Sequence, residues 1–347
     1  MSTETVTPPR PRTRLSNEYV ESLTDKTLLV TGAGGYLGTA LLSSLYNIRC
    51  RIHALIERRC LPPDDREATF TSRSADLSRS GVWLDVLRDI RPDVIVNLGS
   101  HEHRRNSQHA PELDLAVNTA TVLELLEACR ELNLKPRIVQ ASSANIAGCP
   151  TSPLVNEDTP DQPLTLYAIN KQTAERYLNY YAETFNIPSI SLRFANIYGP
   201  LPSREAELES RVVLNSIMRR ALEGGPLYLY RNQACVRDFV YVDDVVRAIC
   251  AVAAGESTAP GGKYVVGSGE GYSLGEIVNE IARQIENFDR PPVEVLFDAE
   301  AALAPIEWRD FIADFSRLHS ATGWEPKIKL HQGINTTLRA FIGGQTP

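Results

Sequence analysis

A glycine-rich turn near the start of the chain constrains the fold more than any other stretch. Residues 28–31 are mostly apolar, as in a short buried strand, and residues 39–46 have the composition of a helix. Between them lie Gly32, Gly35 and Gly38. A backbone without side chains at these positions can approach a pyrophosphate, and the helix N-terminus then offers free N–H groups and the positive end of its dipole. The Gly-x-x-Gly-x-x-Gly spacing differs from the general dinucleotide fingerprint, but its strand–turn–helix context favours a phosphate-binding turn over a plain structural one.

The rest of the chain alternates apolar strands with helical patterns. This alternation predicts an α/β fold with a doubly wound, Rossmann-type parallel sheet, whose ligands bind at the carboxyl ends of the strands. After Pro200 the pattern loosens, although residues 239–254 and 264–266 are expected to return to the sheet. The expected divisions are a disordered leader over 1–22, a dinucleotide-binding domain over 23–199 with 237–268, and a smaller, mixed α/β substrate-binding lobe over 200–236 with 269–340.

Charge and composition exclude several classes of protein. A net charge of -7 argues against non-specific binding of nucleic acid or of an anionic membrane surface. No apolar run approaches the roughly 20 residues that a membrane-spanning helix needs. The first residues contain Pro, Thr and Arg without an apolar core, which is typical of a flexible leader and not of a signal peptide. Six scattered cysteines without a Cys-x-x-Cys pair predict reduced thiols and a cytoplasmic protein.

A tyrosine and a lysine four residues apart are the second feature with chemical meaning. If a helix begins near Leu166, Tyr167 and Lys171 lie on one face of it. An ammonium near a phenol favours the phenolate and lowers the tyrosine pKa from about 10, which suits an acid/base near neutral pH. Ser143 follows a buried strand, where its hydroxyl can hydrogen-bond a substrate oxygen. Each feature taken alone is better explained by a surface pair or by a loop that satisfies its own backbone.

Several longer motifs join these features. The two most specific are Leu192-Arg193-Phe194-Ala195-Asn196-Ile197-Tyr198-Gly199-Pro200 and Arg237-Asp238-Phe239-Val240-Tyr241-Val242-Asp243-Asp244. Three others are Asn97-Leu98-Gly99-Ser100, Asn118-Thr119-Ala120-Thr121 and Gly323-Trp324-Glu325-Pro326. With the glycine turn, Ser143 and the Tyr-x-x-x-Lys pair, the chain resembles the extended short-chain dehydrogenase/reductase family. Within it, the chain resembles the nucleotide-sugar branch, the NAD-dependent epimerase/dehydratase group.

This resemblance implies a role for each matching residue. Tyr167 would be the catalytic acid/base, Ser143 would hold the reacting hydroxyl, and Lys171 would hold the nicotinamide ribose. The dinucleotide, NAD or NADP, would be bound by Gly32, Gly35, Tyr36, Leu37, Gly38, Glu57, Arg58, Asp76, Leu77, Leu98, Gly99, Ser100 and Asn118, together with Tyr167 and Lys171. The nucleotide-diphosphate sugar would be bound by Ser143, Asn196, Arg237 and Arg309.

The choice between the two dinucleotides stays open at this point. The family carries an Asp at the end of its second strand, where it hydrogen-bonds the adenosine ribose, and this chain has Ile56 there. Glu57 could take the acidic role and favour NAD. Arg58 could instead pair with a 2′-phosphate and favour NADP.

Two other local sequences narrow the chemistry. Dehydratases of the family carry Asp-Glu after the catalytic threonine, whereas this chain has Ala144-Asn145, so dehydration is not expected. His101-Glu102-His103 invites a metal site, but its histidines are only two apart and no third ligand follows at a known spacing. We therefore expect no bound metal.

The resemblance leaves three functions to be distinguished. The first is a nucleotide-sugar epimerase, expected to act at C4 by transient hydride transfer to the bound dinucleotide. The second is an NADPH-dependent 4-ketoreductase of a nucleotide-linked 4-keto-deoxysugar. The third is a non-catalytic dinucleotide-binding scaffold, which would have no need of Ser143, Tyr167 and Lys171. Residues 113–132 and 172–185 correspond to the helices that pair in dimers of the family, so a homodimer is expected.

Overall fold

A seven-stranded parallel sheet forms the centre of the computed structural model, which describes residues 15, 17–56, 67–77, 79, 81–100, 110–200, 212–255, 258–288 and 290–343. The strand order is β12-β7-β5-β4-β1-β2-β3. Because the order reverses between β1 and β4, their carboxyl ends flank the place where such sheets bind ligands. The predicted doubly wound sheet is confirmed. Its strands are β1 (Thr27–Thr31), β2 (Arg51–Ile56), β3 (Thr69–Ser74), β4 (Val94–Asn97), β5 (Arg137–Ser143), β7 (Ser189–Phe194) and β12 (Lys263–Val266).

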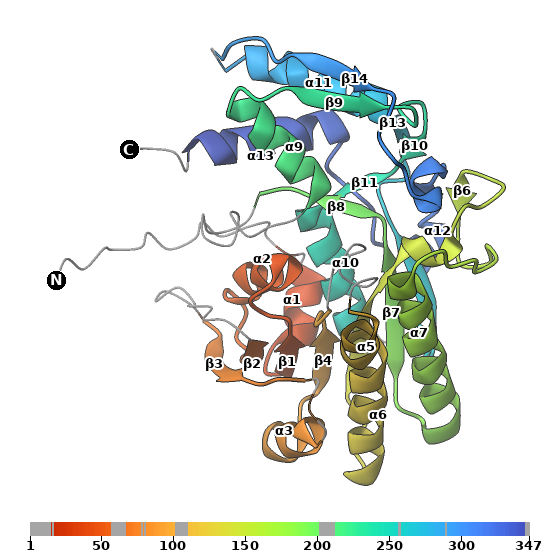
Figure 1. The fold of residues 1–347 in the computed structure, drawn as a ribbon. Coiled ribbons are helices and arrows are strands. Elements are labelled where there is room, and N and C mark those ends of the chain that lie inside the picture. Colours follow the sequence, from red (N-terminus) through yellow and green to blue (C-terminus); the bar gives the residue numbers. More distant parts are fainter. Residues whose placement is uncertain are drawn as a thin grey trace.

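Helices cover both faces of this sheet (Figure 1). Successive side chains of a strand point to opposite faces, so Val30 and Val96 pack in one core while Leu29 and Ile95 pack in the other. The continuous apolar sequence of β1 and β4 thus follows from burial on both sides. The first core is covered by α2 (Tyr36–Leu45) and α10 (Val242–Ala254), and the second by α3 (Val82–Ile90), α6 (Thr121–Glu131) and α7 (Leu166–Phe185).

The expected disordered leader over 1–22 is wrong at its end. Residues Asn17–Leu23 form helix α1, which contacts α10. Leu15 and Leu23 are buried and Tyr19 packs against the same core. Tyr19 and Leu23 are four residues apart and so lie on one face of α1, while Leu15 precedes the helix and is buried in the same core. Burying that face stabilises a helix whose preceding residues are rich in proline.

The expected single helix over 113–132 is interrupted. It begins as α5 (Pro111–Leu115), continues as a π-helical turn η1 (Ala116–Ala120) and then becomes α6. A π-helical turn shifts the side chains after it around the helix axis and often lies at a functional site. Here it carries Asn118, one of the predicted cofactor-binding residues.

A smaller group of elements lies beyond the carboxyl ends of the sheet strands, at the top of Figure 1. It contains α9 (Val213–Leu222), α11 (Leu274–Glu286) and α13 (Leu330–Gly343), with the parallel pair β9 (Leu227–Tyr230) and β14 (Val295–Asp298). The remaining short elements are η2 (Ala144–Ala147), β6 (Leu154–Val155), β8 (Asn196–Tyr198), β10 (Val236–Arg237), β11 (Phe239–Tyr241), β13 (Tyr272–Ser273), η3 (Pro305–Trp308), β15 (Ile312–Ala313) and α12 (Ser316–Thr322).

The chain returns to the sheet as expected at residues 264–266, within β12. The expected return over 239–254 needs a correction, because β11 pairs with β8 in a separate two-stranded sheet and only α10 packs on the main sheet. Both strands lie within the two most specific motifs, β8 in residues 192–200 and β11 in residues 237–244. In the part of the chain that the structure describes, no helix is both long enough and apolar enough to cross a membrane.

Candidate active site

The glycine turn is held in a conformation that side chains would not permit. Gly32 has φ +60°, and a Cβ there would lie 2.8 Å from the backbone nitrogen of Gly99. A Cβ on Gly38 would lie 2.2 Å from the carbonyl oxygen of Gly32. The nitrogen of Gly35 donates to that same carbonyl at 2.9 Å, and no side chain caps the N-terminus of α2. Helix N–H groups that lack side-chain caps are suited to receive phosphate oxygens.

The predicted cofactor residues of β4 and the following loop lie against this turn. Gly99 N–H donates to Oγ1 of Thr31 at 3.0 Å, and Leu77 lies beside Gly99. Ser100 Oγ donates to Oδ1 of Asn118 at 2.8 Å, which connects the strand end to the π-helical turn. The structure therefore brings the glycine turn together with five predicted residues, Leu77, Leu98, Gly99, Ser100 and Asn118.

The other predicted cofactor residues differ in burial and in the residues that they contact. Tyr36 is half-buried, and its hydroxyl donates to the carbonyl of Gly199 at 2.8 Å. Asp76 is exposed and pairs with Arg79 at 3.2 Å. Leu37, like Leu98, is partly buried against the main core. Glu57 and Arg58 lie outside the described residues, as does His101-Glu102-His103.

The predicted catalytic pair lies in the first turns of α7. The side chain of Thr165 caps this helix by accepting from the N–H of Ala168 at 3.2 Å, which fixes where the helix begins. The Nζ atom of Lys171 lies 5.6 Å from the ring centroid of Tyr167. Lys171 is only 2% exposed, and its ammonium donates to the carbonyl of Ala141 at 3.1 Å. The one-turn spacing read from the sequence thus places the charge over the phenol ring.

Ser143 lies at the same edge of the sheet. It is the last residue of β5, two residues after the carbonyl that accepts from Lys171. Its Oγ accepts from the N–H of Asn145 at 3.2 Å and so caps the short helix η2. The hydroxyl can still donate to a substrate oxygen, because the capping bond uses it as an acceptor.

A buried ion cluster, which sequence reasoning missed, connects these elements. The guanidinium of Arg193 on β7 contacts Glu175 at 2.5 Å and Asp161 at 2.6 Å. Ser142, next to the predicted catalytic serine, donates to Glu175 at 2.5 Å. Burial alone would raise the pKa of Asp161, but the hydrogen bonds and charge of Arg193 outweigh it and hold the pKa below its usual 3.8. Glu175 follows Lys171 by four residues, and this spacing could have pointed to the cluster.

Three of the predicted substrate residues, Asn196, Arg237 and Arg309, lie in two groups of hydrogen-bonded residues. Asn196 on β8 donates to the carbonyl of Asp238 at 2.8 Å. Arg237 is 7% exposed, and its guanidinium donates to the carbonyls of Glu307, at 2.8 Å, and of Arg309. Arg309 is also buried and lies over the ring of Phe311. Arg237 and Arg309 are therefore neighbours, while their contact with a diphosphate stays a prediction.

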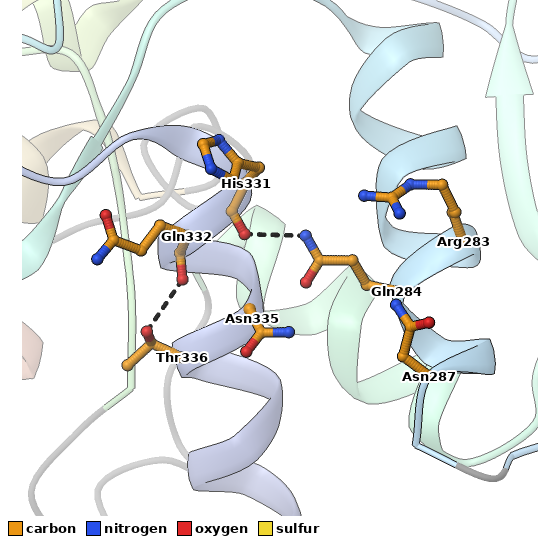
Figure 2. Close-up of a pocket in the computed structure, with 7 residues that line it drawn as sticks. All are labelled: Arg283, Gln284, Asn287, His331, Gln332, Asn335 and Thr336. Carbon is orange, nitrogen blue, oxygen red and sulfur yellow. Dashed lines mark hydrogen bonds between the residues drawn. The ribbon is translucent and has the colours of Figure 1, made fainter.

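A cleft of about 340 Å³ lies between α11 and α13, away from these residues (Figure 2). Gln284 crosses from α11 and donates to the carbonyl of His331 at 2.8 Å (Figure 2). None of the predicted site residues lines this cleft. Its lining residues are Arg283, Gln284, Asn287, His331, Gln332, Asn335 and Thr336.

The described residues contain no cluster of three or more histidine, cysteine, aspartate or glutamate side chains placed to hold a metal. The five described cysteines all carry free thiols.

Comparisons with known proteins identify the family. Residues 28–267 match the NAD dependent epimerase/dehydratase family. UDP-glucose 4-epimerase of Mycolicibacterium smegmatis is 26% identical, over 90% of this chain and 97% of that protein. UDP-glucuronate 4-epimerase 2 of Arabidopsis thaliana is 29% identical, over 94% of this chain and 78% of that protein.

A solved structure supports the same assignment. UDP-glucose 4-epimerase of Thermus thermophilus, in complex with NAD, superimposes with a TM-score of 0.74 at 28% identity, covering 91% of this chain and 99% of that one. The resemblance read from the motifs is confirmed. The chain belongs to the NAD dependent epimerase/dehydratase family and is an enzyme of that family.

Proposed function

We propose that this enzyme interconverts UDP-sugars that differ in configuration at C4, using NAD. The carrying observation is that the Lys171 ammonium lies 5.6 Å from the Tyr167 ring centroid and donates to the carbonyl of Ala141, two residues before Ser143 at the carboxyl end of β5. The UDP-sugar and the carbon are supported by the names of two relatives, a UDP-glucose 4-epimerase matched over 97% of its length and a UDP-glucuronate 4-epimerase matched over 78%.

The glycine turn fits a dinucleotide. It brings three glycines against the N-terminus of α2, which no side chain caps, so backbone N–H groups can face a pyrophosphate. Gly32, Gly35 and Gly38 would hold the pyrophosphate, and Lys171 would hold the nicotinamide ribose. When bound, NAD supplies the acceptor and later the donor of the C4 hydride.

The protein residues move the proton and hold the sugar oxygen. Tyr167, as phenolate, accepts the proton of the C4 hydroxyl while the hydride leaves C4, so the sugar becomes a 4-ketone. Ser143 donates a hydrogen bond to that oxygen and keeps it beside Tyr167. After the sugar ring presents its other face, Tyr167 returns the proton as the hydride returns to C4. The configuration at C4 is inverted, and neither the cofactor nor Tyr167 is consumed.

Glu57 is proposed as the group that selects NAD. Its carboxylate would hydrogen-bond the adenosine ribose and repel the 2′-phosphate of NADP, and Arg58 would then have no role in cofactor choice. We expect binding titrations with the two dinucleotides to favour NAD, and Glu57→Gln to reduce that preference. A protein that prefers NADP would support the ketoreductase instead.

The decisive experiment supplies UDP-glucose and UDP-glucuronic acid separately to the purified protein with NAD. Formation of the C4 epimer from either one, without net change in cofactor absorbance, supports the proposal. Stoichiometric consumption of NADPH with a 4-keto-deoxysugar nucleotide, and no epimer from either UDP-sugar, would overturn it in favour of the reductase. Dinucleotide binding without turnover of any of these compounds would support the scaffold.

A homodimer is proposed from the exposed apolar side chains on α5 and α7. Leu115, Ile169 and Tyr180 are 50%, 43% and 54% exposed, and α5 and α7 contact each other. Pairing with a second copy would bury these side chains. Sedimentation is expected to give a dimer for the wild type and a monomer for Ile169→Glu, while Leu154→Glu, at an exposed position outside these helices, stays dimeric. The cytoplasmic location stays a prediction.

A further inference from the structure

Three polar side chains form a hydrogen-bonded row inside the sheet. Thr31 on β1 is in register with Asn97 on β4, and Asn97 is in register with Gln140 on β5. Their exposed fractions are 0%, 1% and 1%. Thr31 Oγ1 donates to Oδ1 of Asn97, and Asn97 Nδ2 donates to Oε1 of Gln140 at 2.7 Å. The row therefore crosses three neighbouring strands without contact with solvent.

Both ends of this row reach the candidate active site. At one end, Oγ1 of Thr31 accepts from the N–H of Gly99, beside the glycine turn. At the other end, Nε2 of Gln140 donates to the carbonyl of Ala141 at 3.0 Å. That carbonyl is also the acceptor for Lys171 Nζ, at 3.1 Å. A carbonyl oxygen has two lone pairs and can accept both bonds.

The row has one direction. The side-chain amides of Asn97 and Gln140 each accept through the oxygen and donate through the nitrogen, and both nitrogens face the Lys171 end of the row. Flipping either amide, so that its oxygen and nitrogen exchange places, would place a donor against a donor or an acceptor against an acceptor. Buried amides cost free energy unless both groups are paired, and in this row both groups of Asn97 and of Gln140 are paired. An apolar residue at position 140 would need no such pairing to be buried. The row therefore ends in a buried donor on the carbonyl of Ala141.

We propose that Gln140 is a positioning residue for Lys171. By donating to the carbonyl of Ala141, Gln140 fixes the acceptor that holds the lysine ammonium beside Tyr167. The row also couples that acceptor to the strand end at Gly99, where the dinucleotide is proposed to bind. This inference rests on the proposed function for its kinetic consequence, but the placement of the ammonium can be measured without a substrate.

The test compares Gln140→Met with a matched control, Gln284→Met. Gln284 is likewise buried, at 3% exposed, and donates two hydrogen bonds through Nε2 where Gln140 donates one, but it lies on α11 in the smaller lobe. With a UDP-sugar, Gln140→Met is expected to lower kcat about tenfold with little change in KM, because the catalytic pair is misplaced. The basic form of Tyr167 is expected to appear on the order of one pH unit higher, because the ammonium is less well placed. Gln284→Met is expected to lower only the melting temperature.

Tyrosine ionisation gives a readout that needs no turnover. The phenolate absorbance of each protein is titrated, and the same titration of its Tyr167→Phe counterpart is subtracted. Gln140→Met is expected to move the difference curve to higher pH, and Gln284→Met to leave it in place. An unmoved curve in Gln140→Met would overturn the proposal, even if no UDP-sugar were turned over and the proposed function had failed.

A second variant tests the hydrogen-bond donor of Gln140 separately from the polarity of its side chain. It also provides a test if Gln140→Met does not fold. Gln140→Glu keeps the length of the side chain and can still accept from Asn97, but as a carboxylate it cannot donate to the carbonyl of Ala141. We expect the kcat of Gln140→Glu to fall while its KM is retained. A kcat and pH–rate profile equal to those of the wild type would overturn the proposal.

Discussion

Lys171 donates a hydrogen bond to the carbonyl of Ala141 while its ammonium lies 5.6 Å from the centroid of the Tyr167 ring. Lys171 on α7 is thereby hydrogen-bonded to β5 and faces Tyr167, which lies one helical turn earlier. Because Lys171 is buried, its charge is screened little by solvent and acts at short range on the phenol. This arrangement carries the proposed acid/base chemistry.

Replacing Tyr167 by phenylalanine tests that chemistry. The variant lacks the hydroxyl that exchanges the C4 proton, so turnover is expected to fall by roughly 10² to 10⁴-fold. NAD binding measured by calorimetry should stay close to that of the wild type. Tyr180→Phe is the matched control, because Tyr180 lies on the same helix but is 54% exposed. Full turnover in Tyr167→Phe would contradict the mechanism.

The glycine turn is tested by Gly38→Ala. The new Cβ would lie 2.2 Å from the carbonyl oxygen of Gly32, so either α2 or the turn must move. We expect a loss of NAD affinity and of about 1–3 kcal/mol of unfolding free energy, as for other overpacked sites. Gly275→Ala, in the first turn of α11, has its nearest neighbour at 3.5 Å and is expected to leave NAD affinity unchanged. Equal effects of the two substitutions would contradict this account of the turn.

The ion cluster predicts a loss of stability in acid. The pKa of Asp161 is lowered in the folded protein, so its contribution is present above the ordinary pKa of 3.8 and is lost as pH falls through the folded value. Urea unfolding of the wild type should therefore show a stability that declines below about pH 4, and Asp161→Asn should reduce that decline. As a control, Asp25→Asn alters a surface pair with Arg49 in which both side chains are more than two-thirds exposed. A decline of the same size in Asp161→Asn as in the wild type would count against the role of Asp161.

Removing the cation of the same cluster is expected to be more damaging. Arg193→Met leaves Glu175, 8% exposed, without its buried positive partner, which costs about 3–5 kcal/mol. The loss should appear in denaturant unfolding. Arg73→Met breaks an ion pair with Asp89 in which both side chains are more than half exposed, and should cost less than about 1 kcal/mol. A comparable loss in both variants would mean that the cluster contributes no more than a surface pair.

A buried carboxylate joins the π-helical turn to the catalytic helix. Asp114 is fully buried and accepts from the amides of Asn118, at 3.1 Å, and Asn170, at 2.6 Å. Asp114→Ala removes the acceptor of both amides and is expected to destabilise the protein by about 3 kcal/mol, measured by denaturant unfolding. Asp85→Ala, which breaks an exposed pair with Arg88 on α3, serves as the control. A loss no larger than that of Asp85→Ala would refute this role of Asp114.

Elements whose pattern is local can be predicted from the amino-acid sequence alone. Strands Arg51–Ile56 and Ser189–Phe194 and helix Val82–Ile90 belong to the alternation of strand and helix patterns that predicted the doubly wound sheet. The four-residue spacing of Tyr167 and Lys171 is also local, because one helical turn brings them together whatever surrounds the helix. The family motifs predicted which residues at the strand ends belong to the site.

Contacts between segments that are distant in the sequence could not be predicted, because they depend on how the whole chain packs. The burial of α1 depends on α10, more than two hundred residues later, and β11 pairs with β8 instead of joining the main sheet. The donors of Arg237 are taken by carbonyls of the segment that carries Arg309. In the sequence, Gln140 is a single polar residue within the buried part of an expected strand. Its role depends on strand register, which sets it between Asn97 and the carbonyl that holds Lys171, and register arises from long-range packing and not from local pattern.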